Sequence, residues 1–157
     1  MSAGAARPAR RADVPAIAAL WAALVEEHGA LDTALAVRPG AVDELPAAVL
    51  RMLRDPAAAL WVWEGPGGVS GFCAAQRRVG PPAAAERARV EITELVVAPE
   101  ARRRGIGRAL VSAALAWAAA GGARRIEVRV AARNPAGQAF WRALGFADFV
   151  DVLDRRL

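Results

Sequence analysis

The sequence predicts a single α/β domain in which helices and strands alternate around one mixed sheet. Apolar residues recur at helical spacing in two long stretches, after Asp13 and after Gly105, and shorter apolar runs are typical of strands. Turns rich in glycine and proline separate these stretches. The 157 residues suit one domain, and no repeat or linker divides them, so we expect one domain over residues 1–157.

The first half of the chain predicts a short edge strand, two helices and a β-hairpin. Their ranges are residues 6–9, 13–28, 41–53, 60–64 and 69–76. Pro8 confines the first strand to a sheet edge, because proline has no backbone N–H to donate. Asp13 is the expected N-cap of the first helix, and Gly29 marks its expected end.

The second half predicts strands and helices in alternation, ending on a strand. Their ranges are residues 90–97, 105–121, 126–130, 135–144 and 146–153. Strands joined through helices form βαβ units with parallel pairing, whereas the hairpin in the first half is antiparallel. The sheet is therefore expected to be mixed.

The composition indicates a globular protein, with 55% hydrophobic residues and a mean hydropathy of +0.23. Arg, Glu or Gly interrupts the apolar runs, so we expect none to reach the roughly 20 residues of a membrane span. The first eight residues lack the apolar core of a secretion signal. The single Cys73 lies in an apolar run, where a small buried side chain is expected. We therefore expect a cytoplasmic protein without a membrane partner.

The chain is basic, but its charge pattern does not indicate a nucleic-acid partner. The net charge is +5 and every basic residue is Arg, which gives a pI of about 11.2. The arginines are scattered in pairs, without a basic helix face interleaved with aromatic residues. Only residues 102–104, together with Arg108, form a dense cluster. No metal site is expected.

This cluster and the glycines beside it predict an anion site. Arg102, Arg103 and Arg104 precede Gly105-Ile106-Gly107, between a predicted strand and a predicted helix. The first amides of a helix lack intrahelical partners, glycine lets an anion approach them, and arginine adds charge-assisted hydrogen bonds. These features together suit a diphosphate.

Two other interpretations of the turn remain open. One is a solvated basic helix start, with glycines that only allow a tight turn. The other is a dinucleotide-binding turn, since Glu127 follows about 20 residues later, where a ribose-binding acid would stand. Leu110 replaces the third glycine of that fingerprint, however, and the motif comes late in the chain.

At this point a family resemblance becomes specific. Residues 96–110 (VVAPEARRRGIGRAL) resemble the acetyl-CoA-binding signature of the GNAT superfamily of N-acetyltransferases, and residues 134–146 (NPAGQAFWRALGF) resemble its later motif. Residues 7–13 and 69–72 are also similar to that family, and the order of elements matches almost end to end. The resemblance implies a GNAT-like mixed sheet of about six to seven strands with about four helices.

The resemblance also implies acetyl-CoA as co-substrate and a set of residues that hold it. The backbone of residues 95–97 would pair with the pantetheine arm, residues 102–108 would bind the pyrophosphate, and three residues of the later motif would contact the arm and the sulfur end. The implied residues are Leu95, Val96, Val97, Arg102, Arg103, Arg104, Gly105, Ile106, Gly107, Arg108, Asn134, Phe140 and Trp141.

Two glutamates are candidates for the general base that deprotonates the amine. Glu91 aligns with the base of histone-type members of the family, whereas Glu94 lies nearer the expected thioester. In a regular strand the two side chains point to opposite faces, so they can share a site only if a bulge intervenes. Solvated strand charges are the alternative for both residues.

The general acid departs from the family pattern. Trp141 stands where many members carry a tyrosine, and the chain contains no Tyr. An indole N–H donates a hydrogen bond but is too weak an acid to protonate a thiolate. The hypothesis is that water supplies the proton, or that the thiolate leaves unprotonated.

The acceptor is the least determined part. Trp21 and His28 are candidate substrate-binding residues, near acids that would suit a cationic amine, although both also lie on the apolar stripe of their helix. The resemblance implies direct acetyl transfer in a ternary complex to a primary amine, expected to belong to a small molecule. Acetylation of a peptide or protein amine, or a non-catalytic CoA-binding regulatory module, are the alternatives. A homodimer is left open.

Overall fold

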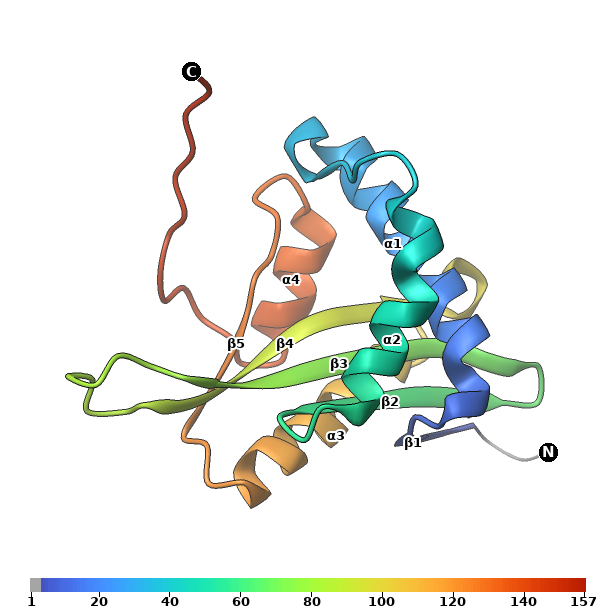
Figure 1. Ribbon diagram of the computed structural model, residues 1–157, viewed down its shortest axis with the longest axis horizontal. Coiled ribbons are helices and arrows are strands. Elements are labelled where there is room, and N and C mark those ends of the chain that lie inside the picture. The colour runs from blue at the N-terminus through green and yellow to red at the C-terminus, as the bar shows by residue number, and fades with distance from the viewer. Residues whose placement is uncertain (1–3) are drawn as a thin grey trace.

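The computed structural model describes residues 4–157 and contains one five-stranded sheet with helices on both faces (Figure 1). The strands lie in chain order across the sheet. Their bounds are β1 Ala5–Pro8, β2 Ala58–Gly65, β3 Gly68–Val79, β4 Ala88–Val97 and β5 Arg125–Val128. β1 to β4 are antiparallel neighbours, and β5 is parallel to β4. The predicted α/β class and the mixed sheet are confirmed.

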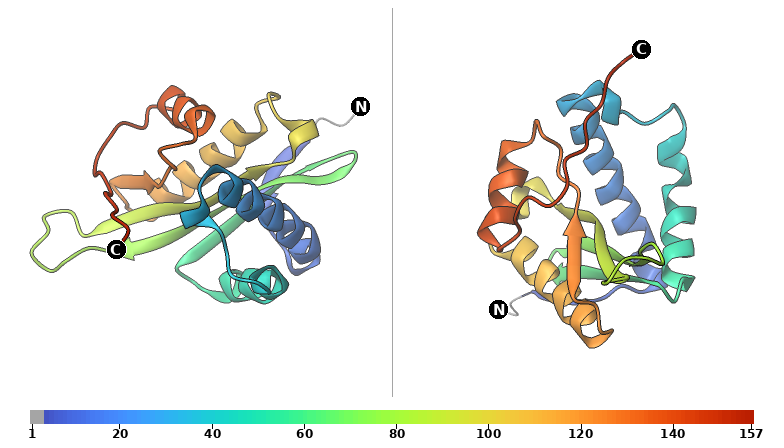
Figure 2. Two further views of the ribbon diagram at one scale, coloured as in Figure 1. Left: turned by 90° about the horizontal axis from the view of Figure 1, so that it is seen from above. Right: turned by 90° about the vertical axis from the view of Figure 1, so that its left-hand side faces the viewer.

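Four α-helices cover the sheet, two on each face (Figure 2). α1 and α2 lie on one face, and α3 and α4 lie on the other. Their bounds are α1 Val14–Leu31, α2 Leu45–Arg54, α3 Ile106–Ala120 and α4 Pro135–Ala143. Short 3-10 turns precede α1 at Arg11–Asp13, lie between α1 and α2 at Thr33–Leu35 and Ala41–Glu44, and follow β4 at Pro99–Ala101.

The predicted last strand over residues 146–153 is wrong, and it accounts for the strand count below six. Residues 147–157 are extended but pair with no strand of the described chain. Apart from Ala147 and Leu157, the apolar residues of this segment come in two pairs, Phe149-Val150 and Val152-Leu153, separated by Asp151. In a strand, each face would therefore carry both apolar and acidic side chains, and neither face could be buried whole on the domain.

Two apolar clusters fill the spaces between the layers. The cluster under α3 and α4 includes Cys73, Ile92, Leu110 and Trp141. The cluster under α1 and α2 includes Ile17, Val49, Val62, Phe72 and Val96. Cys73 is fully buried, as predicted, and burial raises the pKa of its thiol to about 12. The thiol is therefore un-ionised near neutral pH and is not a nucleophile.

By length and composition, the helical stretch Arg11–Leu31 is apolar enough to cross a membrane, contrary to the expectation from sequence. The reason is that residues 14–25 form an apolar run whose first charge is Glu26. Val14, Ile17 and Ala18 of this stretch are buried in the domain. A helix that packs on a core passes the same composition test.

A buried carboxylate fixes the start of α1 to the sheet. Asp13 accepts two hydrogen bonds from the Arg7 guanidinium, at 2.8 and 2.9 Å, and one from the Arg10 amide at 2.7 Å. Arg7 also donates to Glu64 of β2 at 2.6 Å. Asp13 precedes α1 as predicted, but its carboxylate does not cap the helix amides. It joins β1 to α1 instead, and the pairing with Arg7 lowers its pKa below the usual value.

We expect Asp13→Asn to lower the free energy of unfolding by about 2–4 kcal/mol, because the part-buried Arg7 would lose its charged partner. The lowered pKa means that this stabilisation is complete above the ordinary Asp pKa of 3.8 and is lost as the pH falls further. Thermal unfolding of both proteins at neutral and acid pH measures this. The exposed Asp43→Asn is the control, and an equal effect of both substitutions would contradict the proposed role of the ion pair.

Candidate active site

β4 and β5 diverge halfway along β4. The second half of β4 therefore has one edge without a neighbouring strand. The two strands pair only from Arg89 to Ile92 on β4, opposite Arg125 to Val128 on β5. β4 continues to Val97, and over this second half it pairs with β3 alone. Within residues 4–157, no strand covers the other edge of residues 93–97. Apart from the Val97 carbonyl, which accepts a hydrogen bond from Arg102, alternate backbone N–H and C=O groups of this edge are therefore free to bind an extended ligand.

An extra residue in β4 lies where the strands diverge. Ile92 is opposite Ala75 and Glu94 is opposite Ala74, so Thr93 is a bulge between them. Because Glu91 is opposite Gln76, the bulge places Glu91 and Glu94 on the same face of the sheet. Ala74 belongs to the cluster under α1 and α2, so this is the face that those helices cover.

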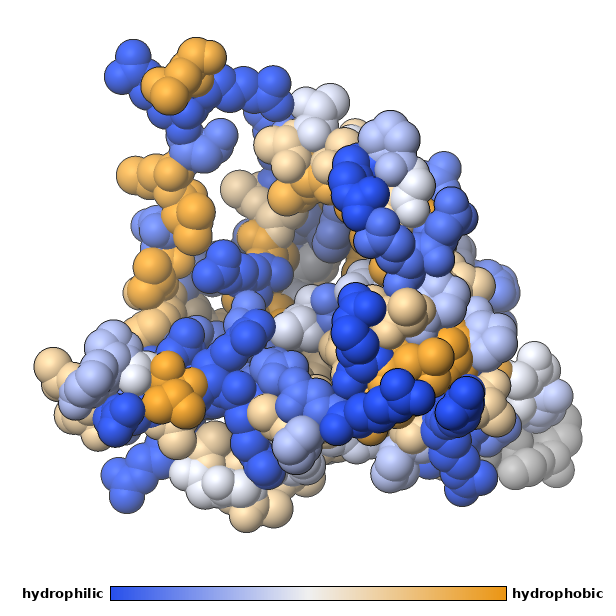
Figure 3. Space-filling view, in the orientation of Figure 1, coloured by the Kyte–Doolittle hydropathy of each residue, from blue (hydrophilic) through white to orange (hydrophobic). Residues whose placement is uncertain are grey.

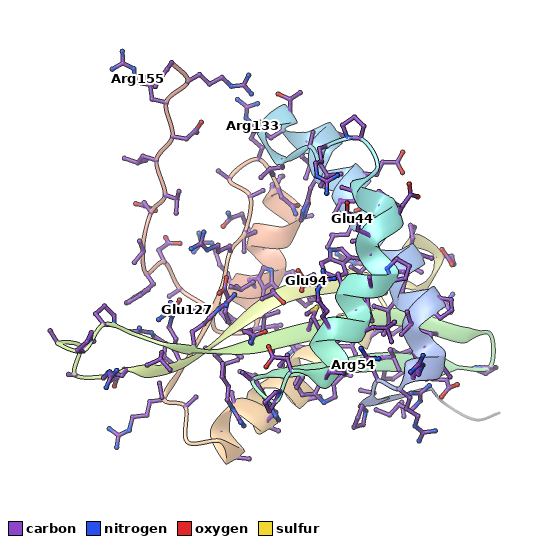
Figure 4. The ribbon with its side chains drawn as sticks, in the orientation of Figure 1. Glu44, Arg54, Glu94, Glu127, Arg133 and Arg155 are labelled. Atoms are coloured by element: carbon purple, nitrogen blue, oxygen red, sulfur yellow. The ribbon has the colours of Figure 1, made fainter. Side chains whose placement is uncertain are left out.

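The two glutamates have different surroundings. Glu91 forms an ion pair with Arg78 at 2.9 Å and a longer one with Arg129 at 3.7 Å. Glu94 has no ion-pair partner among the described residues and accepts a hydrogen bond from the hydroxyl of Thr93. Figure 4 shows Glu94 near the middle of the molecule.

The pKa of Glu94 is raised above its usual value. Burial is the main cause and the negative charge of Glu91 adds to it, while the Thr93 hydrogen bond and the Arg78 charge act in the opposite direction. Glu94 is thus a carboxylate that binds a proton more readily than an exposed one.

The arginine-glycine turn enters α3 through two residues of left-handed backbone, Arg103 with φ 64° and Gly105 with φ 80°. A left-handed φ is costly for arginine and easy for glycine, so Arg103 is held in a sparsely populated conformation. Among residues 4–157, no oxygen accepts a hydrogen bond from the amides of Ile106, Gly107 and Arg108. These amides lie at the positive end of the α3 dipole and can bind an anion.

Gly107 has a packing role that the sequence did not reveal. A Cβ at this position would lie 3.2 Å from two ring atoms of Phe140. The missing side chain therefore lets α4 pack against the first turn of α3. Phe140 is half-buried and lies beside the same turn that presents the free amides.

Arg102 connects the turn to α1, a contact that sequence spacing could not indicate. Its Nε donates to the carbonyl oxygen of Val97 at 2.9 Å, and its terminal nitrogen pairs with Glu27 at 2.7 Å. The end of β4, the turn and the last third of α1 are thus held together by one guanidinium. Arg103, Arg104 and Arg108 are exposed.

The later motif forms the start and the buried face of α4. Asn134 is the N-cap, and its side-chain oxygen accepts from the Gly137 amide at 2.9 Å. Trp141 is 8% exposed and makes edge contacts with the rings of Phe140 and Phe146, each at 5.1 Å between centroids. Its indole is therefore a packed core group.

The candidate acceptor residues lie on α1. Trp21 packs against Phe72 with ring centroids 6.3 Å apart, and His28 is half-buried near the end of the helix. A hollow of about 350 Å³ adjoins a different face of α1, where Glu26 is the one charged residue of its lining. The lining residues are Ala22, Val25, Glu26, Gly29, Ala36, Val37 and Val42.

Comparison with solved structures shows the same fold in several proteins of low sequence identity. The tetramutant of the BH1408 protein from Bacillus halodurans matches with a TM-score of 0.88 and 21% identity, over 97% of this chain and 99% of that one. The aminoglycoside N-acetyltransferase AAC(6')-Iy in complex with CoA matches with a TM-score of 0.79 and 21% identity, over 100% and 96%. A GCN5-related N-acetyltransferase from Ralstonia eutropha matches with a TM-score of 0.79 and 23% identity, over 98% and 99%.

Comparison with protein-family models shows which family the chain belongs to. A search of curated proteins finds no match. The family model described as "Acetyltransferase (GNAT) family" matches residues 19–146, which include β2 to β5, the arginine-glycine turn and α4. The chain therefore belongs to the GNAT family of acetyltransferases and is an acyltransferase.

Proposed function

We propose that this protein transfers the acetyl group of acetyl-CoA to a primary amine of a small molecule, directly and in a ternary complex. The observation that carries the proposal is the free edge of β4, which lies between the amides of the arginine-glycine turn and the carboxylate of Glu94. A donor bound along that edge would have its phosphates at one end and a base at the other.

The residues of the turn fit a diphosphate. The free amides of Ile106, Gly107 and Arg108 supply hydrogen bonds, and Arg103, Arg104 and Arg108 supply charge. The free edge of β4 at Leu95, Val96 and Val97 would hold the pantetheine arm, and Asn134, at the N-cap of α4, and Phe140 and Trp141, within α4, would contact the arm and its sulfur end. When bound, acetyl-CoA supplies the activated thioester. Arg102 already bonds the Val97 carbonyl, so that oxygen is shared between the turn and the arm.

Glu94 is the better candidate for the general base. A base that works near neutral pH needs a pKa raised toward that range, which burial provides for Glu94. The carboxylate of Glu91 is instead held by two arginines, which favours a structural role. Glu94 would accept a proton from the ammonium form of the acceptor, directly or through one water.

Trp141, which stands where many members of the family carry a tyrosine, is not a suitable acid for the departing thiolate. Trp141 is packed between two phenylalanines and its N–H is not acidic. We infer that water protonates the thiolate, or that it leaves as an anion held by hydrogen bonds. The lack of a tyrosine also supports the second candidate function, a non-catalytic CoA-binding module.

The acceptor is expected to be cationic, because acids cluster at the end of α1. Glu26, Glu27 and Asp32 stand within one helical turn or two of His28 and Trp21. AAC(6')-Iy, a structural neighbour, is known in complex with a bisubstrate analog of CoA and acetylneamine. We propose that Trp21 and His28 border the acceptor, which we assign to small amines rather than to nucleic acid or lipid. The buried free thiol of Cys73 is compatible with the cytoplasmic location that we also propose.

Acetyl-CoA should raise the melting temperature of this protein by several degrees, since a ligand at about 100 times its Kd adds about 2.7 kcal/mol of stability. Arg104→Glu should remove most of this shift, because it places a negative charge at the phosphate site. Arg87→Glu, an exposed arginine before β4, is the matched control and should keep the shift. Equal stabilisation of both variants by acetyl-CoA would contradict the assignment of the turn as the phosphate site. Gly107→Glu is a poorer test, because its side chain would collide with Phe140.

Glu94→Gln should lower kcat/KM by about a hundredfold or more, the usual contribution of a general base. Glu91→Gln should lower it by less than about threefold, within the range of a lost surface ion pair. Because the pKa of Glu94 is raised, the ionised carboxylate destabilises the fold above the usual Glu pKa of 4.5. Glu94→Gln should therefore melt at a higher temperature than the wild type at pH 8, with the difference vanishing below pH 4.5. Equal losses of activity in the two variants would argue against Glu94 as the base.

A further inference from the structure

Six charged residues from β3, β4 and the region of β5 form one group of ion pairs, which we call the sheet-face group. Each of its two glutamates lies between two arginines, at N···O distances of 2.9 to 3.7 Å. Four arginines and two glutamates give the group a net charge of +2. Its members are Arg78, Arg89, Glu91, Arg125, Glu127 and Arg129.

The sheet-face group lies on the face of the sheet opposite α3. Alternate residues of β4 and β5, among them Val90 and Ile126, pack in the cluster under α3 and α4. The charged residues between them therefore point to the other face, and their ion pairs bring Arg78 and Arg129 to it as well. α1 and α2 cross another part of that face (Figure 1), and hydrophilic residues gather on the part that these helices leave uncovered (Figure 3).

The register of the strands sets like charges of this group opposite one another. Arg89 is opposite Arg125, and Glu91 is opposite Glu127, in the parallel ladder between β4 and β5. Arg78 is also opposite Arg89. Like charges directly opposite destabilise a sheet, and exposed ion pairs contribute little in return. Folding alone therefore gives no reason for this arrangement, whereas an anionic ligand would neutralise its excess positive charge.

Arg129 is the member of the group that is most free to bind a ligand. Its side chain is 84% exposed, and its ion pair with Glu91 is the longest of the four, at 3.7 Å. Val128 is the last residue of β5 that pairs with β4, and Arg129 follows it at the level of the bulge, where the strands diverge. Its guanidinium is a planar fork of N–H donors, which matches the oxygens of a carboxylate or a phosphate.

The sheet-face group borders the candidate base. Glu91 and Glu94 lie on the same face, and the bulge leaves them neighbours along the strand, roughly 7 Å apart. The charges of Glu91 and Arg78 both influence the pKa of Glu94, so both groups lie close to its carboxylate. A ligand whose amine meets Glu94 therefore has arginines within the length of a small molecule.

We propose that the acceptor carries an anionic group besides its amine, and that Arg129, with Arg78 beside it, binds this group while the amine faces Glu94. The acceptor would then be a small amine that bears an oxyanion, a carboxylate as in amino acids or a phosphate as in amine phosphates. The acids at the end of α1 suit the ammonium group of the same molecule. This assigns the acceptor of the acetyl transfer, so it rests on the proposed function.

Pairs of amines that differ by one anionic group test the proposal. Tyrosine and tyramine, like lysine and cadaverine, differ by a carboxylate, whereas phosphoethanolamine and ethanolamine differ by a phosphate. We expect kcat/KM for acetyl transfer to favour the anionic member about tenfold or more, the usual effect of a hydrogen bond to a charged group. The kind of pair that shows this preference identifies the oxyanion as a carboxylate or a phosphate.

Three variants test the role of Arg129. Arg129→Gln should remove the preference, mainly by raising KM for the anionic member about tenfold. Arg129→Lys should restore part of the preference, because lysine keeps the charge but lacks the planar fork. Arg87→Gln is the matched control, since Arg87 is also exposed but lies outside the sheet-face group, and it should keep the full preference.

Calorimetric binding of the same amines to the CoA-saturated protein separates two kinds of failure. If no amine is acetylated, but the anionic member binds more tightly than its partner and loses this advantage in Arg129→Gln, the proposed function fails and the anion subsite stands. Equal rates and equal binding within every pair overturn the subsite, and so does a preference for the uncharged members. A preference for the anionic member that Arg129→Gln leaves intact overturns it as well.

Discussion

One extra residue in a strand controls the arrangement of the whole candidate site. Without Thr93 as a bulge, Glu91 and Glu94 would face opposite sides of the sheet, and β4 would have no cause to bend at this point. The pairing with β5 ends at Ile92, immediately before the bulge. The free edge of β4 thus begins at the same bulge that places Glu94 on the face covered by α1 and α2.

The remaining parts of the site are held in place by packing rather than by hydrogen bonds alone. Gly107 lets the ring of Phe140 approach the first turn of α3, so the position of α4 depends on that one missing side chain. Trp141 in turn packs against Phe140 and Phe146, which joins α4 to the segment that follows it. The free amides at the start of α3 therefore lie on a turn fixed from two sides, by the core and by α4.

The elements that could be predicted from sequence are those whose signals are local. Helical spacing, turn residues and apolar runs predicted four helices and five strands correctly, and the order of four motifs predicted the family. The prediction of a strand over residues 146–153 was wrong because strand propensity alone does not show whether one face of the strand can be buried. The sequence left open whether a bulge separates Glu91 from Glu94, since an extra residue in a ladder is visible only against its partner strand.

Contacts between residues far apart in the sequence could not be predicted either. Nothing in the spacing of residues joins Arg102 to Glu27, or Gly107 to Phe140, because each pair is brought together by tertiary packing. The same holds for Asp13, which was expected to cap a helix and instead serves as the partner of Arg7. Local sequence patterns identify a residue that forms hydrogen bonds, but they do not identify its partner side chain.

The ion pair between Arg102 and Glu27 links the arginine-glycine turn to the end of α1 through one positive charge. An anion that draws the guanidinium toward the turn leaves the carboxylate of Glu27 without its partner, and the end of α1 then becomes more acidic in its surface potential. By linkage, a cation that occupies Glu27 strengthens the hold of the turn on an anion to the same degree. Two oppositely charged ligands would thus bind cooperatively across this guanidinium, without any movement of the backbone.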